Sequence, residues 1–148
     1  SGLASFTNLQ TLNLASNEIT DISAFFSLTS LQTLYLDWNE ITNIVPLFSL
    51  TNLQTLSIST NDITNISALS FLTNLQTLNL KWNKITDISS VSSLTNLKIL
   101  RLDYNQISDV SSLVSLTNLT DLYLCGNPIS SEDIFWLKLQ LPNTTIRF

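Results

Sequence analysis

The chain has 148 residues, of which 44% are hydrophobic and 11% are charged, and its formal net charge is −5 at pH 7. This length suits one domain, and the apolar content argues against a disordered chain. Six Lys and Arg against eleven Asp and Glu give no electrostatic reason to bind nucleic acid. With one cysteine and no histidine, the sequence excludes an internal disulfide and cysteine-based zinc sites, so we expect no metal or cofactor.

The first eight residues look like the end of a repeated unit whose complete copies follow. Leu3 occupies the position of Leu47 in that unit, and Phe6 occupies the position of Leu50. We therefore expect the chain to be a fragment of a longer protein, with its N-terminal cap and targeting signals elsewhere. No apolar run approaches the roughly 18 residues that would indicate a transmembrane helix, so we expect no membrane insertion by this fragment.

One unit of 22 residues then recurs along the chain. Its copies begin at Leu9, Leu31, Leu53, Leu75, Leu97 and Leu119, and each follows the pattern L-x-x-L-x-L-x-x-N-x-I. The pattern and its period resemble those of leucine-rich repeats. The resemblance implies an α/β solenoid, a right-handed arc whose stacked units share one core. We assign this array to residues 1–129, including the partial unit at the start.

Each unit predicts a short strand, an asparagine turn and a tight convex segment. Leucines alternate with polar residues, as in Leu12-Asn13-Leu14, which predicts parallel strands on the concave face. The segment typified by Ile85-Thr86-Asp87-Ile88-Ser89 is too short for an α-helix and predicts 3-10 or extended turns on the convex face. Between them lies an asparagine that can satisfy buried backbone groups, so we predict a structural ladder. Its members are Asn17, Asn39, Asn61, Asn83, Asn105 and Asn127.

The repeat pattern breaks at Pro128, and residues 130–148 look like a C-terminal helical cap. Ser130 or Ser131 is expected to cap a helix that ends before Pro142. The residues expected on its inward face are Ile134, Phe135, Leu137 and Leu139. The last residues alternate like one more strand, with Ile146 and Phe148 inward. This cap would shield the apolar end of the array.

The units share the longer pattern (S/T)-L-T-N-L-x-x-L-x-L-x-x-N-x-I-T-D-I-S over roughly residues 3–129. This resembles the repeats of bacterial internalins and internalin-like surface proteins, and Val45-Pro46-Leu47 is similar to a step common in that family. The resemblance implies an adhesin-like or receptor-binding module at the bacterial surface or secreted, with a host or cell-surface protein as partner. Intracellular eukaryotic proteins similar to a phosphatase regulator share the spacing, so a cytoplasmic scaffold or regulatory subunit is an alternative.

Comparison of the six units shows constant inward positions and variable outward positions. The eighth position holds Trp38, Trp82 and Tyr104, which we expect to form one outward-facing column at the concave edge. Aromatic and arginine side chains ringed by charge are typical of protein-interaction hot spots. The predicted ligand-binding residues are Tyr35, Asp37, Trp38, Lys81, Trp82, Arg101, Asp103, Tyr104 and Tyr123. The competing interpretation is that these aromatics only stack across strands and stabilise the sheet.

Other functions are less well supported by the residues. With no histidine, two glycines and no plausible nucleophile–base pair, we expect no enzyme. Asp37 and Asp103 lie three units apart, about 14 Å at ordinary strand spacing, which is too far for glycoside hydrolysis. A carbohydrate-binding module remains an alternative, because flat aromatic rows also suit sugar rings. On the convex side, Phe26 and Phe48 share a position in adjacent units and either pack together or form a second contact surface.

Overall fold

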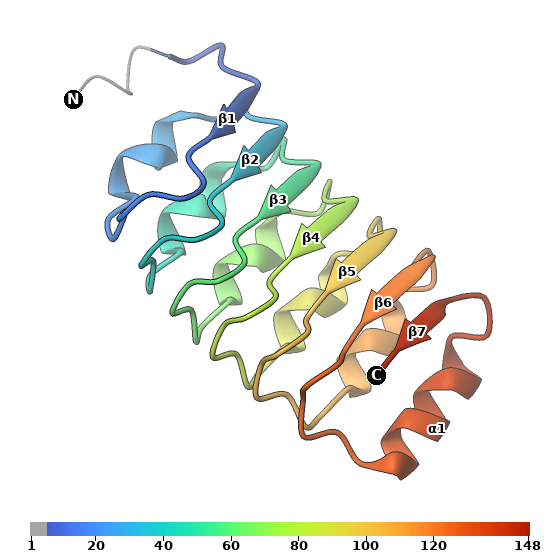
Figure 1. Cartoon of the computed structure of the whole chain (residues 1–148). Coiled ribbons are helices and arrows are strands. Elements are labelled where there is room, and N and C mark those ends of the chain that lie inside the picture. The colour runs from blue at the N-terminus through green and yellow to red at the C-terminus, as the bar shows by residue number, and fades with distance from the viewer. Residues whose placement is uncertain (1–5) are drawn as a thin grey trace.

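The computed structural model describes residues 6–148, so Leu3 lies outside the described part of the chain. One open sheet of parallel strands runs through these residues in chain order (Figure 1). The strands are β1 (Thr11–Asn13), β2 (Thr33–Tyr35), β3 (Thr55–Ser57), β4 (Thr77–Asn79), β5 (Ile99–Arg101), β6 (Asp121–Tyr123) and β7 (Thr145–Arg147). Equivalent residues pair from unit to unit, as Leu12 with Leu34 and Leu34 with Leu56. The expected parallel solenoid is therefore confirmed.

Short 3-10 helices form the side opposite the sheet, as expected for the convex segments (Figure 1). They are η2 (Ser23–Ser27), η3 (Val45–Ser49), η4 (Ser67–Phe71), η5 (Ser89–Ser93) and η6 (Ser111–Ser115). An Asx turn precedes each helix: the Asp87 carboxylate, for example, accepts a hydrogen bond from the Ser89 backbone N–H at 2.8 Å. That bond, with a second from the Ser89 side chain, holds the pKa of Asp87 below its ordinary value. The local bond fixes where each 3-10 helix begins.

Leucines and isoleucines from all units form one continuous core between the sheet and the 3-10 helices. The strand residues Leu34, Leu56 and Leu78 are fully buried, and burying each such side chain contributes about 1.5–3 kcal/mol. The first unit is more open, with Leu12 and Leu14 only half-buried. Phe6 is 55% exposed, although its carbonyl accepts a hydrogen bond from the Leu9 N–H as the Leu50 carbonyl does from Leu53. The turn before the strand is thus retained while its side chain is left outside the core.

The asparagine after each strand joins its own unit to the preceding one. The Asn83 amide group donates to the carbonyl oxygens of Ile58 at 3.0 Å and Leu80 at 3.1 Å, and its Oδ1 accepts from the Ile63 N–H at 3.0 Å. Asn39, Asn61, Asn105 and Asn127 make the same three kinds of bond. Asn17 donates to carbonyls of its own unit. Backbone groups that the turn removes from water therefore keep hydrogen-bond partners.

A second asparagine column, to which the sequence analysis gave no role, lies on the surface just before the strands. Asn96 donates to the carbonyl oxygen of Thr73 in the preceding unit at 2.9 Å. Asn52, Asn74 and Asn118 make the equivalent bond in their own units. The recurrent L-T-N-L pattern was the available signal. These bonds are exposed, so each replaces a bond to water and adds little to stability.

The C-terminal segment folds as a helix and a strand that close the array. Helix α1 (Ser131–Gln140) is capped by Ser130, whose hydroxyl accepts a hydrogen bond from the Asp133 N–H at 3.1 Å. The helix lies beside η6, and β7 pairs with β6. None of the helices in the described chain is both long enough and apolar enough to cross a membrane.

The predicted inward face of α1 is partly wrong. Leu137 and Leu141 are buried, whereas Phe135 and Leu139 are 67% and 61% exposed. Residues four apart share a side of a helix, so these two pairs form opposite stripes and only one can contact the core. Phe148, expected to point inward, is 37% exposed and has the Lys138 ammonium 5.3 Å from its ring centroid.

We predict that Asn83→Ala lowers the free energy of unfolding by about 1–3 kcal/mol, because it leaves the buried Ile63 N–H and Ile58 carbonyl without their partner. Urea unfolding followed by circular dichroism measures this loss. The matched control is Asn96→Ala, which removes one exposed hydrogen bond and should change stability by less than about 0.5 kcal/mol. Equal effects of the two substitutions would contradict the role assigned to the buried ladder.

We also predict that deletion of residues 131–148 causes aggregation, because it uncovers the leucine face of the sixth unit. Two point variants separate burial from composition. Leu137→Ala should cost about 2–5 kcal/mol, since a buried leucine is removed, and Leu139→Ala should be close to neutral. Size-exclusion chromatography and thermal melts provide the measurements. A soluble, monomeric truncated chain with an unchanged melting profile would refute the capping role.

Candidate functional site

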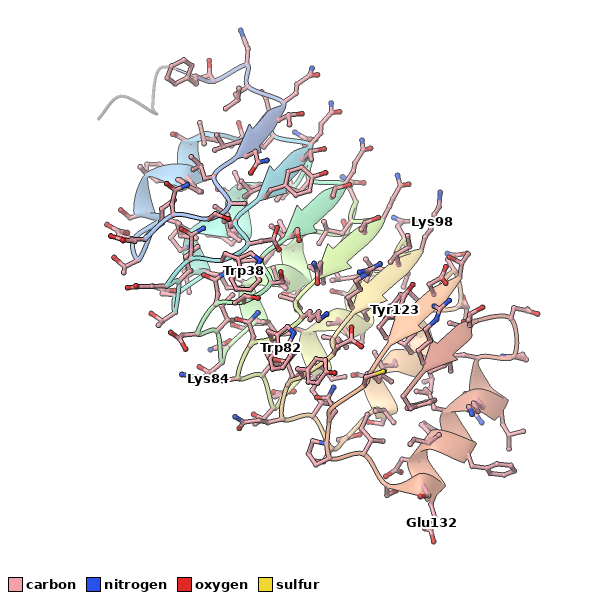
Figure 2. The ribbon with its side chains drawn as sticks, viewed as in Figure 1. Trp38, Trp82, Lys84, Lys98, Tyr123 and Glu132 are labelled. Carbon is pink, nitrogen blue, oxygen red and sulfur yellow. The ribbon has the colours of Figure 1, made fainter. Side chains whose placement is uncertain are left out.

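The outward side chains of the strands, together with the residues that immediately follow them, form one surface that we call the sheet face. Figure 2 shows Trp38 and Trp82 beyond the ends of their strands and Tyr123 on β6. Parallel pairing brings equivalent positions of successive units side by side, as Arg101 beside Tyr123 and Tyr123 beside Arg147. The repeat thus aligns residues from distant parts of the sequence in columns across the face.

The column that holds the aromatics has an unusual backbone conformation. Trp38, Trp82 and Tyr104 have φ angles of 58°, 57° and 55°, and Gly126 at the same position has 70°. This left-handed conformation costs a residue with a Cβ atom about 1–2 kcal/mol, whereas glycine adopts it freely. Tryptophan and tyrosine are therefore poor choices here for stability alone. The sequence analysis missed this feature, although Gly126 at the eighth position was a signal.

Two of the three aromatics stack on each other. The rings of Trp82 and Tyr104 have centroids 3.9 Å apart and lie within 5° of parallel. Tyr104 lies over Gly126, where an added Cβ atom would come within 2.5 Å of its ring. Trp38 belongs to β2, two units before Trp82, and Thr60 occupies the intervening position. Stacking therefore accounts for part of the column, as the competing interpretation expects.

The aromatic column nevertheless remains largely open to solvent. Trp38 is 64% exposed, Trp82 is 51% exposed and Tyr104 is 42% exposed. Exposed aromatic area of this size on one surface is uncommon and marks candidate interaction sites. The stack holds Trp82 and Tyr104 in fixed positions, while Trp38 stands apart as the most exposed ring of the column.

A second aromatic group lies on β5, β6 and β7. The Arg101 guanidinium carbon is 4.6 Å from the centroid of the Tyr123 ring, and the Arg147 guanidinium carbon is 4.7 Å from it. Two cations therefore lie over one half-buried tyrosine. Arg147 was not among the predicted site residues, although the alternation of the last strand placed it outward. Tyr35, the other tyrosine of this column, is half-buried on β2.

Arg147 also engages the carboxylate at the start of β6. Its Nη1 lies 3.1 Å from Asp121 Oδ1, and the Thr120 hydroxyl donates to Asp121 Oδ2 at 3.0 Å. The hydrogen bond from Thr120, followed by that from Arg147, lowers the pKa of Asp121 from its ordinary value. Both carboxylate oxygens of Asp121 thus already have donors.

The predicted charged rim is only partly present. Asp37 Oδ1 accepts hydrogen bonds from the Ser57 hydroxyl at 2.6 Å and from the Ser59 N–H at 2.9 Å, so this carboxylate joins β2 to the next unit. Asp103 is buried, at 7% exposure, and not at an exposed rim; its short side chain stands in a column beside the longer Lys81. The Lys81 ammonium lies 5.7 Å from the Tyr104 ring centroid. Within residues 6–148, no cluster of three or more acidic, cysteine or histidine side chains could hold a metal ion.

The convex phenylalanines pair differently from the expectation. Phe48 contacts Phe71, with ring centroids 6.3 Å apart in an edge-to-face arrangement. Phe71 follows Ser70, which occupies the position of Phe48 in the next unit. Phe26 is 59% exposed. The pairing of Phe26 with Phe48 is therefore replaced by a contact one unit further along the array.

Comparison with known proteins agrees with the fold. A family model described as "Leucine Rich repeats (2 copies)" matches residues 7–49, 30–71, 51–94, 73–115 and 95–138. An internalin (inlF) from Listeria monocytogenes is 41% identical, with a TM-score of 0.94, over 99% of this chain and 43% of its own. Internalin C2 (inlC2) from the same species is 36% identical, with a TM-score of 0.84, over 98% of this chain and 74% of its own.

A leucine-rich repeat protein of Leptospira interrogans, LIC12759, is 32% identical, with a TM-score of 0.92, over 99% of this chain and 38% of its own. This chain thus spans less than half of the inlF and LIC12759 chains. A search of curated protein sequences finds no match. The overlapping repeat matches and the internalin structures together show that the chain belongs to the leucine-rich repeat family, as an internalin-like member.

Proposed function

We propose that the chain is a non-enzymatic binding module that holds a protein partner against its sheet face. Solenoids of this family commonly present an extended surface of this kind to other proteins. The observation that supports this function most directly is the column of exposed aromatics at left-handed backbone positions. Selection for stability alone would favour glycine or asparagine there.

The geometry suits anchoring of a partner. Trp38, Trp82 and Tyr104 project from a hydrogen-bonded sheet, so their backbone loses little further freedom on binding. Tryptophan, tyrosine and arginine are the residue types most enriched in binding hot spots. At ordinary strand spacing the two tryptophans are about 10 Å apart, a distance that one extended segment or loop of a partner can span.

The similarity to internalins supports an adhesin-like or receptor-binding role, with the protein secreted or at the bacterial surface. The alternative setting is cytoplasmic, as a scaffold or regulatory subunit. Antibody labelling of intact and permeabilised cells that express the parent gene distinguishes the two settings. The binding face proposed here is the same in either case.

Carbohydrate binding is the second candidate, because 64% of Trp38 is exposed and its ring could stack on a sugar. One face of Trp82 is already occupied by Tyr104 at 3.9 Å, so a continuous row of free rings is not formed. A glycan array probed beside a protein pull-down separates the two candidates. Glycan binding that depends on Trp38, without any protein partner, would favour the carbohydrate alternative.

We predict that Trp82→Ala and Trp38→Ala each weaken the binding of a partner isolated by unbiased pull-down by about 2 kcal/mol or more, as expected for central anchors. Thr60→Ala is the matched control, because Thr60 lies between them in the same column and has the same backbone conformation, with φ of 53°. It should leave affinity nearly unchanged. Surface plasmon resonance on the three variants provides the affinities. Wild-type affinity for Trp82→Ala would move the site off this column and direct attention to Phe48 and Phe71.

A second variant separates binding from folding. Trp38→Gly removes the exposed ring and relieves the left-handed strain, so the free energy of unfolding should change by less than about 1 kcal/mol. Affinity for the partner should nevertheless fall as far as in Trp38→Ala. A large loss of stability, measured by urea unfolding, would indicate that Trp38 is mainly a structural residue.

A further inference from the structure

The positive charges of this chain are confined to its second half. None of its six lysines and arginines lies among the first 80 residues. That half carries five carboxylates, Glu18, Asp21, Asp37, Glu40 and Asp62. The cations Lys81, Arg101 and Arg147 all lie on the sheet face of the second half, around the Trp82–Tyr104 stack and Tyr123. The chain is acidic overall, but its principal aromatic surface is bordered by cations.

These cations are not neutralised by their neighbours. Among the described residues, neither Arg101 nor Lys81 makes an ion pair with a carboxylate. Asp121 is engaged by Arg147 and Thr120, one at each oxygen. Asp103 is buried. Arg101 is exposed, and a guanidinium that stacks on an aromatic ring keeps its N–H groups directed outward in its own plane, where they can bind a carboxylate through two hydrogen bonds.

We infer that this half of the sheet face binds an acidic peptide segment of the partner protein. A carboxylate side chain would be received by Arg101 beside Tyr123, with Lys81 contributing a second positive charge. An apolar side chain next to it would pack on the Trp82–Tyr104 stack. This inference depends on the proposed function and adds the chemistry and position of the bound segment.

Long-range electrostatics would not produce this preference. A net charge of −5 repels an acidic peptide at a distance. At physiological salt the Debye length is about 8 Å. Asp37, three strands or about 14 Å from Arg101, is therefore largely screened from a ligand bound there. Attraction must come from the local cations, and it requires direct contact with them.

A peptide segment fits this surface better than an acidic sugar does. The site combines a carboxylate receptor with an adjacent flat aromatic stack, and acidic residues in proteins commonly neighbour large apolar side chains. An acidic sugar supplies the carboxylate without a large apolar group beside it. Sialylated glycans are therefore a test outcome and not part of the inference.

The test uses phage display of random 12-residue peptides on the intact chain, with the Arg101→Gln variant used for counter-selection. Enriched peptides should contain Asp or Glu next to an aromatic or aliphatic residue, more often than the input library. The leading peptide is then labelled, and its Kd is measured by fluorescence anisotropy, beside a version with Asn and Gln in place of Asp and Glu. We expect at least about tenfold weaker binding of the amide version and of the wild-type peptide to Arg101→Gln.

Two further variants serve as controls. Arg101→Lys retains the charge but not the two-pronged geometry, and should weaken binding several-fold. Lys138→Gln removes an equal charge from α1, which lies beside η6 and away from the sheet face, and should leave Kd unchanged. Thermal melts of all variants confirm that they are folded.

The outcomes distinguish this inference from the proposed function. Enriched peptides without acidic bias, or binding lost in Trp82→Ala but unchanged in Arg101→Gln, would overturn the acidic-segment inference and leave the binding face in place. Insensitivity to both substitutions would overturn both. Binding of 3′-sialyllactose that depends on Arg101, with no such dependence for peptides, would also overturn the inference and assign the cations to a glycan.

Discussion

The structure depends on the residue-for-residue pairing of parallel strands between units of equal length. Because every complete unit has 22 residues, Leu12, Leu34 and Leu56 lie in line, and every other position of the unit is aligned with its equivalents. The buried asparagines add the second requirement, since each one supplies hydrogen bonds to the unit before it. Asn83, for example, satisfies Ile58 and Ile63 of the third unit from the turn of the fourth. Core, turns and surface columns all follow from this shared register.

Function adds a different requirement to the same frame. The eighth position of each unit has positive φ whatever residue occupies it, from Ser16 to Gly126. The cost of that conformation is part of the scaffold, but a large aromatic there adds exposed apolar area without a contact to the core. Trp82 and Tyr104 recover part of that cost by stacking on each other. Trp38 has exposed 64% of its surface, and this is the strongest sign that recognition and not folding chose the residue.

Features that depend on the repeat could be predicted from the sequence, and features that depend on side-chain conformation could not. The strands, the 3-10 turns and the helix start at Ser130 follow from spacing and local hydrogen bonding. The burial of Asp103 depends on how neighbouring side chains lie, which no pattern of residue types specifies. Phe135 and Leu139 were assigned inward because they are apolar, although helical spacing sets them apart from Leu137. Arg147 was missed because β7 follows the cap, and its pairing with Tyr123 breaks the 22-residue offset.

The left-handed position after each strand also bears on how such a surface can diversify. A side chain there leaves the sheet without entering the core, so exchanging it alters the outer surface while the leucines beneath keep their packing. The same backbone conformation recurs at Ser16, Trp38, Thr60, Trp82, Tyr104 and Gly126. Each unit therefore offers one site at which mutation can change the partner with little penalty to folding. A lineage of such proteins could change specificity one unit at a time, and every intermediate would remain folded.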